Sequence, residues 1–234
     1  MLRFGADDMT ATPTHDLPPG QRARDTFPRF GVHFADPPPD VPAEPAIEVR
    51  GAVAQPFAIP LARLEELPRR TVVADFHCVA GWSVRDLRWE GVAFRALWEE
   101  AIEPSDQVTH LTFTGLDGFR SVLLLEDALA GDVLVADRLD GAPLDGDHGA
   151  PARLVTPRQY GYMNTKHLCR IELHPRAPSW PRHASRLRSG LLVPVAPHPR
   201  ARVDREERHA RLPGWAVRDL YRRVILPILT RRMG

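Results

Sequence analysis

The sequence predicts an α+β domain that is mostly β. Short β-type runs recur from residue 46 onward, and dipeptides favoured at tight turns, such as Asp117-Gly118 and Asp140-Gly141, separate several of them. Segments with helical spacing are few and short. The strands and helices also lack the regular alternation of a doubly wound sheet. Together these observations favour a strand-rich fold with a few short helices.

The individual elements follow from hydrophobic spacing and from the turn residues between them. Strands are expected at residues 47–53, 71–76, 87–89, 108–114, 121–125, 133–139, 153–156 and 167–173. Helices are expected at residues 61–67, 94–101 and 125–130.

Composition divides the chain into three parts. Residues 1–44 are rich in proline and predict an extended N-terminal arm with few backbone donors to pair. Residues 45–175 hold the expected strands and form the predicted domain. Residues 176–234 form a proline-rich strap, in which prolines interrupt regular elements until Pro213-Gly214 opens a final basic amphipathic helix. We expect this helix to pack on the domain, and docking to a membrane surface or a partner protein is the alternative.

Composition also limits the class of protein. At 234 residues with 43% apolar content, the chain can bury one core without disulfides. Its formal net charge of +1 gives no reason to expect nucleic-acid binding. No apolar run reaches the roughly 18 residues that a membrane span requires. The N-terminus lacks the apolar segment of an export signal, so we expect a cytoplasmic protein.

Cys78, one of two cysteines, lies between a β-type run and the turn Gly81-Trp82, and several kinds of site would suit it. A nucleophile needs a histidine base, but His77 is adjacent on a strand and points to the opposite face. A zinc site is a second possibility, but the possible ligands are far apart in the sequence and lack the close spacing of structural zinc motifs. The candidates for such a site are Cys78, His148, His167 and Cys169. A buried core thiol is the third reading, and Cys169, in an alternating run, is expected in the core.

A fourth reading of Cys78 comes from three separated blocks of sequence that occur in a fixed order. Over about residues 27–175, they resemble the molybdopterin-binding domain of the sulfite oxidase superfamily. The blocks are His77-Cys78-Val79 with Gly81-Trp82-Ser83 and Trp89-Glu90-Gly91-Val92, then Gly115-Leu116-Asp117, then the stretch from His148 to Pro157 with Tyr160-Gly161-Tyr162 and Lys166.

The resemblance implies a fold of mixed sheets and a molybdenum-molybdopterin cofactor, with Cys78 as the metal ligand and catalytic residue. A thiolate is the soft donor that such a metal accepts. Arg153 offers the cofactor phosphate a bidentate fork, and Lys166, the only lysine of the chain, offers a compact charge. The resemblance also assigns further residues to the pterin. These are His77, Asp117 and His148, with Phe30, Tyr160, Asn164 and Thr165 by neighbourhood.

The chain departs from true sulfite oxidases after the cysteine, where Ala80-Gly81-Trp82-Ser83 replaces a stretch with anion-binding arginines. We therefore expect a substrate other than sulfite. The local pattern is closer to the bacterial branch that includes a protein-methionine-sulfoxide reductase subunit. This implies oxygen-atom transfer with a small-molecule or protein-borne substrate, such as a sulfoxide or N-oxide. No CxxCH haem motif is present, so electron transfer requires a separate redox partner. The alternative is a non-catalytic pterin-binding or scaffold protein.

Overall fold

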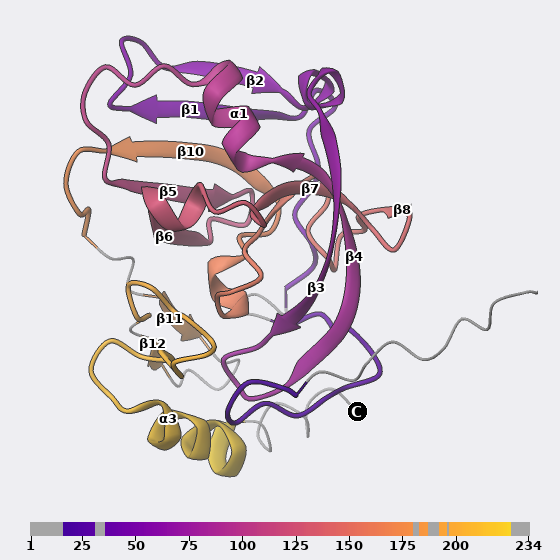
Figure 1. Cartoon of the computed structure of the whole chain (residues 1–234), viewed down its shortest axis with the longest axis vertical. Helices are drawn as coiled ribbons and strands as arrows, with labels where there is room; N and C mark the ends of the chain where they lie inside the picture. Colours follow the sequence, from indigo (N-terminus) through magenta and orange to yellow (C-terminus); the bar gives the residue numbers. More distant parts are fainter. Residues whose placement is uncertain (1–15, 31–35, 180–182, 187–191, 196, 226–234) are drawn as a thin grey trace, which may run out of the picture.

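The computed structural model describes residues 16–30, 36–179, 183–186, 192–195 and 197–225. Two five-stranded sheets form the body of the molecule (Figure 1). The first sheet has the order β2-β1-β10-β5-β6, in which β1 and β10 run parallel and the other neighbours run antiparallel. Its strands are β1 (Ala46–Gly51), β2 (Phe57–Pro60), β5 (His110–Gly115), β6 (Arg120–Leu124) and β10 (Leu168–His174).

The second sheet is antiparallel and has the order β3-β4-β7-β8, with β9 pairing with β7. Its strands are β3 (Arg69–His77), β4 (Ser83–Ala93), β7 (Leu134–Leu139), β8 (Ala142–Pro143) and β9 (Arg153–Val155). β3 and β4 form a long curved ribbon that runs from the end of the molecule near α1 to the end near α3 (Figure 1). The tip of this ribbon carries the loop that contains Cys78.

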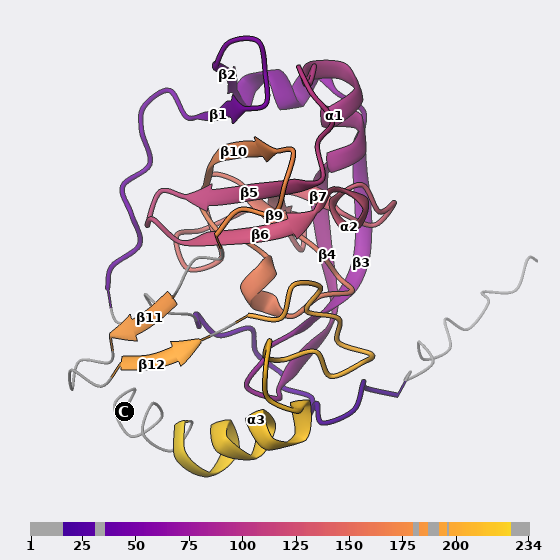
Figure 2. The same ribbon diagram turned by 90° about the vertical axis from the view of Figure 1, so that its left-hand side faces the viewer.

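The helical elements are short, and they lie around the two sheets (Figure 2). They are the α-helices α1 (Phe94–Ala101), α2 (Leu125–Ala128) and α3 (Gly214–Leu220), the 3-10 helices η1 (Leu61–Glu66) and η2 (Gly161–Met163), and the π-helix η3 (Tyr221–Ile225). A separate hairpin pairs β11 (His183–Arg186) with β12 (Leu192–Val195). Among the described residues, no helix is long and apolar enough to cross a membrane.

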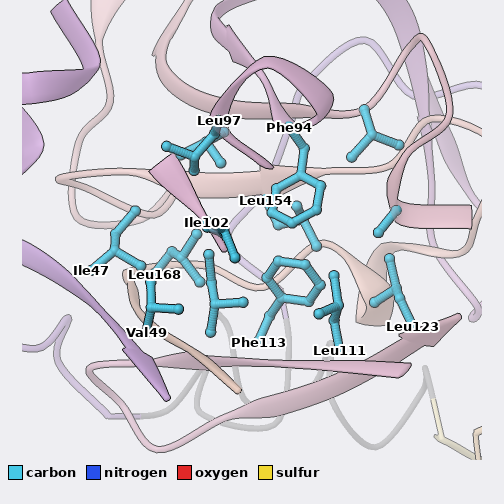
Figure 3. Packing of buried hydrophobic residues seen from close by; sticks show 14 of the residues in the cluster. Ile47, Val49, Phe94, Leu97, Ile102, Leu111, Phe113, Leu123, Leu154 and Leu168 are labelled. Atoms are coloured by element: carbon cyan, nitrogen blue, oxygen red, sulfur yellow. The ribbon is translucent and has the colours of Figure 1, made fainter. Parts of the chain in front are cut away.

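The main core lies where the first sheet meets α1 and the second sheet (Figure 3). α1 buries Phe94 and Leu97, and the Phe94 ring packs edge-on against Phe113 of β5 with centroids 5.3 Å apart. Leu154 of β9 joins the same cluster. Because β9 is anchored in this core, the position of Arg153 at its start is fixed by packing rather than by a loose loop.

The expected fold class is confirmed, since mixed sheets dominate and the helices are few. Several element boundaries were wrong. The helix expected at 61–67 is a 3-10 helix, the one at 125–130 is a single turn, and the strand expected at 87–89 is the eleven-residue β4. β2, β11 and β12 were missed because β2 is a mostly exposed edge strand and β12 contains Pro194, which only an edge strand tolerates.

The placement of Cys169 in the core was also wrong, because it lies half-buried. A β-bulge between Leu168 and Arg170 adds one residue to β10 and shifts the alternation of its side chains. Leu168 and Ile171 therefore both face the core, and the Cys169 thiol lies beside the Thr114 carbonyl oxygen at 3.4 Å. The division of the chain into arm, domain and strap stays a prediction.

Gly91 offers a direct test of how closely β4 and β7 pack. A Cβ atom at Gly91 would overlap the Val135 carbonyl oxygen across the β4–β7 pairing. We expect Gly91→Ala to lower the free energy of unfolding by about 1–3 kcal/mol, as overpacking does in other cores. Gly131→Ala is the matched control, since a Cβ there meets nothing within 4 Å. Equal urea midpoints for the two variants would contradict this account.

Candidate active site

Cys78 directly follows the last residue of β3 and opens the tight loop that joins β3 to β4. The Cys78 N–H donates to the Trp82 carbonyl oxygen at 2.8 Å, and the Gly81 N–H donates to the Cys78 carbonyl oxygen at 3.0 Å. Gly81 has a φ of +93°, which glycine adopts without strain. The Ala80 N–H points at the Cys78 sulfur, 3.5 Å away. The loop is thus closed by its own backbone and holds the sulfur in one place.

The Cys78 thiol is enclosed by apolar side chains, and it is only 5% exposed. Its cluster includes Trp82 and Trp89, with Phe76, Phe30 and Tyr221 packed at its margin. Burial raises the pKa of Cys78 to about 12, although the Ala80 N–H and the charge of Arg208 act in the opposite direction. The free thiol therefore keeps its proton at neutral pH, and a metal would have to displace that proton to bind.

The N-terminal arm pairs with the Cys78 loop, which the sequence did not predict. The Arg24 N–H donates to the Ser83 carbonyl oxygen at 2.8 Å, and the Ser83 N–H donates to the Arg22 carbonyl oxygen at 2.8 Å. The Gln21 amide donates to the Cys78 carbonyl oxygen at 3.3 Å. The described part of the arm therefore lies along the loop and joins it through a single isolated β-bridge between Ala23 and Ser83.

The strap contacts the loop through Arg208, a residue that no pattern in the sequence distinguishes. Its buried guanidinium donates to the Val79 carbonyl oxygen at 2.6 Å and to the Pro19 carbonyl oxygen at 3.3 Å. It also lies 4.8 Å from the centre of the Tyr160 ring. Arg208 thus connects the arm, the Cys78 loop and the strap.

Arg153 is the most unusual side chain of the site, because its guanidinium is 1% exposed and, among the described residues, has no carboxylate partner. It donates to the His148 carbonyl oxygen at 2.8 Å and to the Asn164 carbonyl oxygen at 3.3 Å, while its Nε has no partner. It also lies over the Trp89 ring at 4.9 Å. Burial lowers the pKa of Arg153 to about 9. Such a cation is suited to an anionic ligand.

Two more cations, Lys166 and Arg29, lie close to Arg153. The Lys166 ammonium donates to the Asp147 carbonyl oxygen at 2.6 Å, and Arg29 lies 3.5 Å from the Asp147 carboxylate. Burial, with the charges of Arg153 and Arg29, lowers the pKa of Lys166 to about 7. Gly149, with a φ of +112°, lets the two side chains approach, since a Cβ there would lie 3.1 Å from Lys166 and 3.2 Å from Arg153. We call Arg153, Lys166 and Arg29 the cationic cluster.

Two further predicted residues, His148 and Asp117, lie beside the cationic cluster, and both side chains already have protein contacts. The His148 ring contacts the Asp145 carboxylate at 2.7 Å and the Phe27 carbonyl oxygen at 3.0 Å. Asp117 accepts the Phe119 N–H at 3.0 Å and shapes the turn between β5 and β6. Asp117 also lies near enough to Lys166 to raise its pKa, against the effect of burial.

The His77 ring lies against Ser83, the first residue of β4. Its Nδ1 lies 2.7 Å from the Ser83 hydroxyl, which donates to the Gln21 side chain at 3.0 Å. His77 thus supports the arm and the loop, and its expected weakness as a base for Cys78 stays a prediction.

The predicted residues of lesser weight fall into two places. Asn164 binds Thr156 and Tyr160, and Thr165 lies 2.7 Å from the Ser121 hydroxyl. Both side chains organise the loop that follows β9. Phe30 lies against Trp82 with centroids 5.8 Å apart, beside Cys78. Tyr160 is fully buried under the Cys78 loop, where it packs with Val79 and Val203.

The zinc reading finds no support in the described residues, because nowhere in them do three or more His, Cys, Asp or Glu side chains gather in a way that could hold a metal ion. Cys78 and Cys169 are both free thiols. What the site offers instead is a single buried sulfur, a buried guanidinium at Arg153 and two partly buried cations beside it. This combination fits an organic cofactor that already coordinates a metal ion and also carries an anionic group. The protein then has to supply one sulfur ligand for the metal and cations for the anionic group.

The lowered pKa of Lys166 predicts a pH dependence of stability for the protein without ligand. Unfolded lysine titrates near 10.4, so between pH 7 and 9 the unfolded state binds a proton that the folded state has released. We expect the free energy of unfolding to rise over this range by up to about 1.4 kcal/mol per pH unit. Urea unfolding of wild type and Lys166→Met at pH 7, 8 and 9 measures the slope. Identical slopes for the two proteins would exclude Lys166 as its source.

Comparison with known proteins bears on the identity of this site. Residues 34–180 match the family described as oxidoreductase molybdopterin binding domain. The uncharacterized oxidoreductase YuiH of Bacillus subtilis (strain 168) is 31% identical over 158 residues, which cover 67% of this chain and 78% of YuiH. The protein-methionine-sulfoxide reductase catalytic subunit MsrP of Gluconobacter oxydans (strain 621H) is 28% identical over 201 residues, which cover 76% of this chain and 62% of MsrP.

A solved structure supports the fold. The sulfane dehydrogenase SoxCD from Paracoccus pantotrophus superposes with a TM-score of 0.53 and 23% identity, over 68% of this chain and 44% of that chain. The matched family region contains the Cys78 loop, β9 and the cationic residues Arg153 and Lys166. The chain belongs to the molybdopterin-binding oxidoreductase family of the sulfite oxidases.

Proposed function

We propose that this protein transfers an oxygen atom at a molybdenum centre and that it reduces a sulfoxide. The proposal rests on two buried groups. One is the protonated thiol of Cys78, and the other is the Arg153 guanidinium, which has no carboxylate partner among the described residues. Molybdopterin brings a metal that accepts a thiolate and a phosphate that needs cations, so the residues present fit this cofactor. When bound, the cofactor supplies two-electron redox chemistry and exchange of one oxygen atom.

Each residue has a defined part in this proposal. Cys78 would ligate the metal as a thiolate, and the backbone bonds of its loop hold the sulfur in place. The cationic cluster holds the phosphate, with Arg153 as the bidentate donor. Asp117, His148 and Asn164 keep the surrounding backbone in place through the contacts that they already make. The Phe27 ring packs against Phe76 at an angle of 51°, with centroids 4.7 Å apart, and adds apolar surface to this region.

The surroundings of Cys78 favour a sulfoxide over sulfite. Trp82, Phe30 and Phe76 provide an apolar neighbourhood that suits the carbon substituents of a thioether. Arg208, the cation with the largest effect on Cys78, already binds two carbonyl oxygens. In the proposed reaction the sulfur–oxygen bond breaks, two electrons and two protons are consumed, and the products are a thioether and water. MsrP, by its name, reduces methionine sulfoxide, which makes this the first substrate to test.

The test is to express the chain in a host that makes molybdopterin and to measure metal, pterin and turnover. We expect about one molybdenum and one pterin per chain, and reduction of methionine sulfoxide with reduced methyl viologen as electron donor. Sulfite with ferricyanide as acceptor is the comparison and is expected to be slower. Zinc in place of molybdenum, or a loaded protein that turns over sulfite but not sulfoxides, would refute the proposal. A loaded protein without any turnover would favour the scaffold alternative.

We further propose that electrons arrive from an acidic redox protein that docks on α3. The turn before this helix, the helix itself and the π-helix η3 after it expose large apolar side chains next to arginines, and we call this surface the α3 surface. Its residues are Arg211, Leu212, Trp215, Leu220, Arg223 and Val224. It adjoins the Cys78 loop, because Tyr221 packs on the cluster of Cys78 and Arg222 donates to the Gly20 carbonyl oxygen at 3.1 Å. Positive charge around an apolar centre suits an acidic partner.

Charge reversal tests this docking surface. With reduced flavodoxin as the acidic donor at low salt, we expect Arg211→Glu/Arg223→Glu to slow enzyme reduction by about tenfold or more, because steering by charge is lost. Reduction by methyl viologen should be unchanged. Arg63→Glu on η1 is the matched control, since that residue is exposed and lies away from α3. Equal rates with flavodoxin for all three proteins would rule out the α3 surface.

A further inference from the structure

Arg208 comes from a distant part of the chain, yet its side chain has one fixed place against the Cys78 loop. It lies in the strap between β12 and α3, and its side chain is fully buried. The guanidinium lies over the Tyr160 ring, 4.8 Å from the ring centre, and its Nη1 donates to the Val79 carbonyl oxygen at 2.6 Å. Its Nη2 donates to the Pro19 carbonyl oxygen at 3.3 Å. Because these contacts come from three separate segments, movement of the guanidinium would break at least one of them.

The positive charge of Arg208 is only partly balanced. Within the described ranges, Glu206 supplies the only carboxylate that pairs with it, and Oε1 of Glu206 lies 3.5 Å from Nη2. The same oxygen accepts a shorter bond from Arg218, at 3.0 Å, so one carboxylate serves two guanidinium groups. Among the charged side chains, Arg208 does most to lower the pKa of Cys78 against the effect of burial. The Cys78 loop therefore lies beside a buried charge that its neighbours do not neutralise.

The carbonyl group that Arg208 binds belongs to the same peptide unit as the Ala80 N–H. The peptide bond between Val79 and Ala80 is trans, so its C=O and its N–H point in opposite directions. Arg208 holds the carbonyl end, and the N–H at the other end points at the Cys78 sulfur, 3.5 Å away. The guanidinium, the peptide and the sulfur thus form one chain of hydrogen bonds. A charged donor at the carbonyl polarises the peptide and makes its N–H a stronger donor.

We propose that Arg208 is a positioning residue of the molybdenum site and raises the reduction potential of the metal through the Val79–Ala80 peptide. The inference rests on the proposed function, in which Cys78 is a thiolate ligand. A hydrogen bond to a ligating sulfur withdraws electron density from it, and such bonds tune the potentials of iron–sulfur and copper sites. A fixed positive charge beside the sulfur acts in the same direction, because it favours the state that holds the added electron.

Arg218 provides a matched comparison for the role of the peptide. Its guanidinium binds the same Glu206 oxygen as Arg208, but in the described part of the chain it donates no hydrogen bond to the backbone of the Cys78 loop. Arg218→Met therefore removes an arginine charge from the same neighbourhood and leaves the contact with the Val79 carbonyl oxygen in place. A difference between the two methionine variants reports on that contact and not on charge alone.

A redox titration of molybdenum-loaded protein, followed by the electron paramagnetic resonance signal of the metal, tests the inference. We expect Arg208→Met to lower the potential. At a fixed applied potential, the ratio of reduced to oxidised metal should fall by at least about tenfold, which corresponds to about 59 mV for a one-electron step. Arg218→Met should change this ratio much less. Neither measurement depends on the substrate that the enzyme uses.

Hydrogen exchange at the Ala80 amide tests the same contact in protein without cofactor. We expect Arg208→Met to speed this exchange by about tenfold or more, because the peptide loses the group that holds its carbonyl end. Nuclear magnetic resonance of protein labelled with 15N-alanine measures the rate. Ala136, fully buried in the central strand β7, is the internal reference and should exchange at the wild-type rate if the variant is folded.

Arg208→Lys keeps a positive donor at this position and carries the test if Arg208→Met does not fold. Its potential and its Ala80 exchange rate should both change or both stay at the wild-type value, because the proposal places them under one contact. The inference is overturned if Arg218→Met lowers the potential as much as Arg208→Met, or if either variant at position 208 changes one quantity without the other. A loaded protein that reduces sulfoxides while its potential does not respond to Arg208→Met contradicts this inference alone. A protein that takes up no molybdenum contradicts the proposed function and this inference together.

Discussion

Cys78→Ser is expected to abolish oxygen-atom transfer and to remove one sulfur from the coordination sphere of molybdenum. Serine oxygen is a harder donor than cysteine sulfur, and the serine hydroxyl is a far weaker acid than the thiol. Serine therefore does not replace the thiolate as a metal ligand. We expect turnover of methionine sulfoxide to fall by at least about 1,000-fold, or 4 kcal/mol in the activation free energy. X-ray absorption at the molybdenum edge counts the sulfur neighbours directly, and it should report one fewer in the variant.

The second cysteine provides the matched control for this experiment. Cys169 is half-buried in β10 and its thiol lies beside the Thr114 carbonyl oxygen, so Cys169→Ser keeps a donor at the same place. Cys169→Ser should retain wild-type turnover and an unchanged sulfur count. If both variants behave alike, or if Cys78→Ser keeps its sulfur count, Cys78 is not the metal ligand.

Much of the fold was predictable because periodicity is a local property of the chain. The strands at 133–139 and 108–114 are short runs rich in β-type residues and were placed within one or two residues of β7 and β5. Predictions failed where an irregularity broke the period. β4 contains a register shift at Gly91 and is buried on both faces near its end, so only its centre was visible as a strand. The bulge in β10 misplaced Cys169 in the same way.

The candidate site was predictable to the extent that its residues lie in short motifs. Cys78, Arg153 and Lys166 were proposed because short motifs around them resemble a known family, and the structure places Arg153 and Lys166 together. Arg208 and Gln21 were missed because their roles depend on contacts across 129 and 57 positions of the chain. Neither has a pattern around it that distinguishes it from an ordinary surface residue. Only the packing of arm and strap on the Cys78 loop makes them part of the site.

Arg153→Met is expected to separate cofactor binding from folding. Removing the bidentate cation should weaken retention of the pterin by at least about 100-fold, since truncating one partner of a buried charged pair costs about 3–5 kcal/mol. The effect on the protein without cofactor should be small. Methionine removes the desolvation cost of a buried charge that has no carboxylate partner in the described chain. The variant also loses the hydrogen bonds to the carbonyl oxygens of His148 and Asn164, worth about 1–3 kcal/mol each. These two effects oppose each other.

The comparison between these two quantities decides what Arg153 is for. Pterin fluorescence after gel filtration measures retention, and urea unfolding of cofactor-free protein measures stability, with Arg95→Met as an exposed control that should change neither. If Arg153→Met unfolds far more easily than wild type, the guanidinium serves mainly to hold the His148 and Asn164 carbonyls. If stability stays within about 1 kcal/mol while the pterin is lost, the chain keeps a costly buried charge for its ligand, as functional sites do.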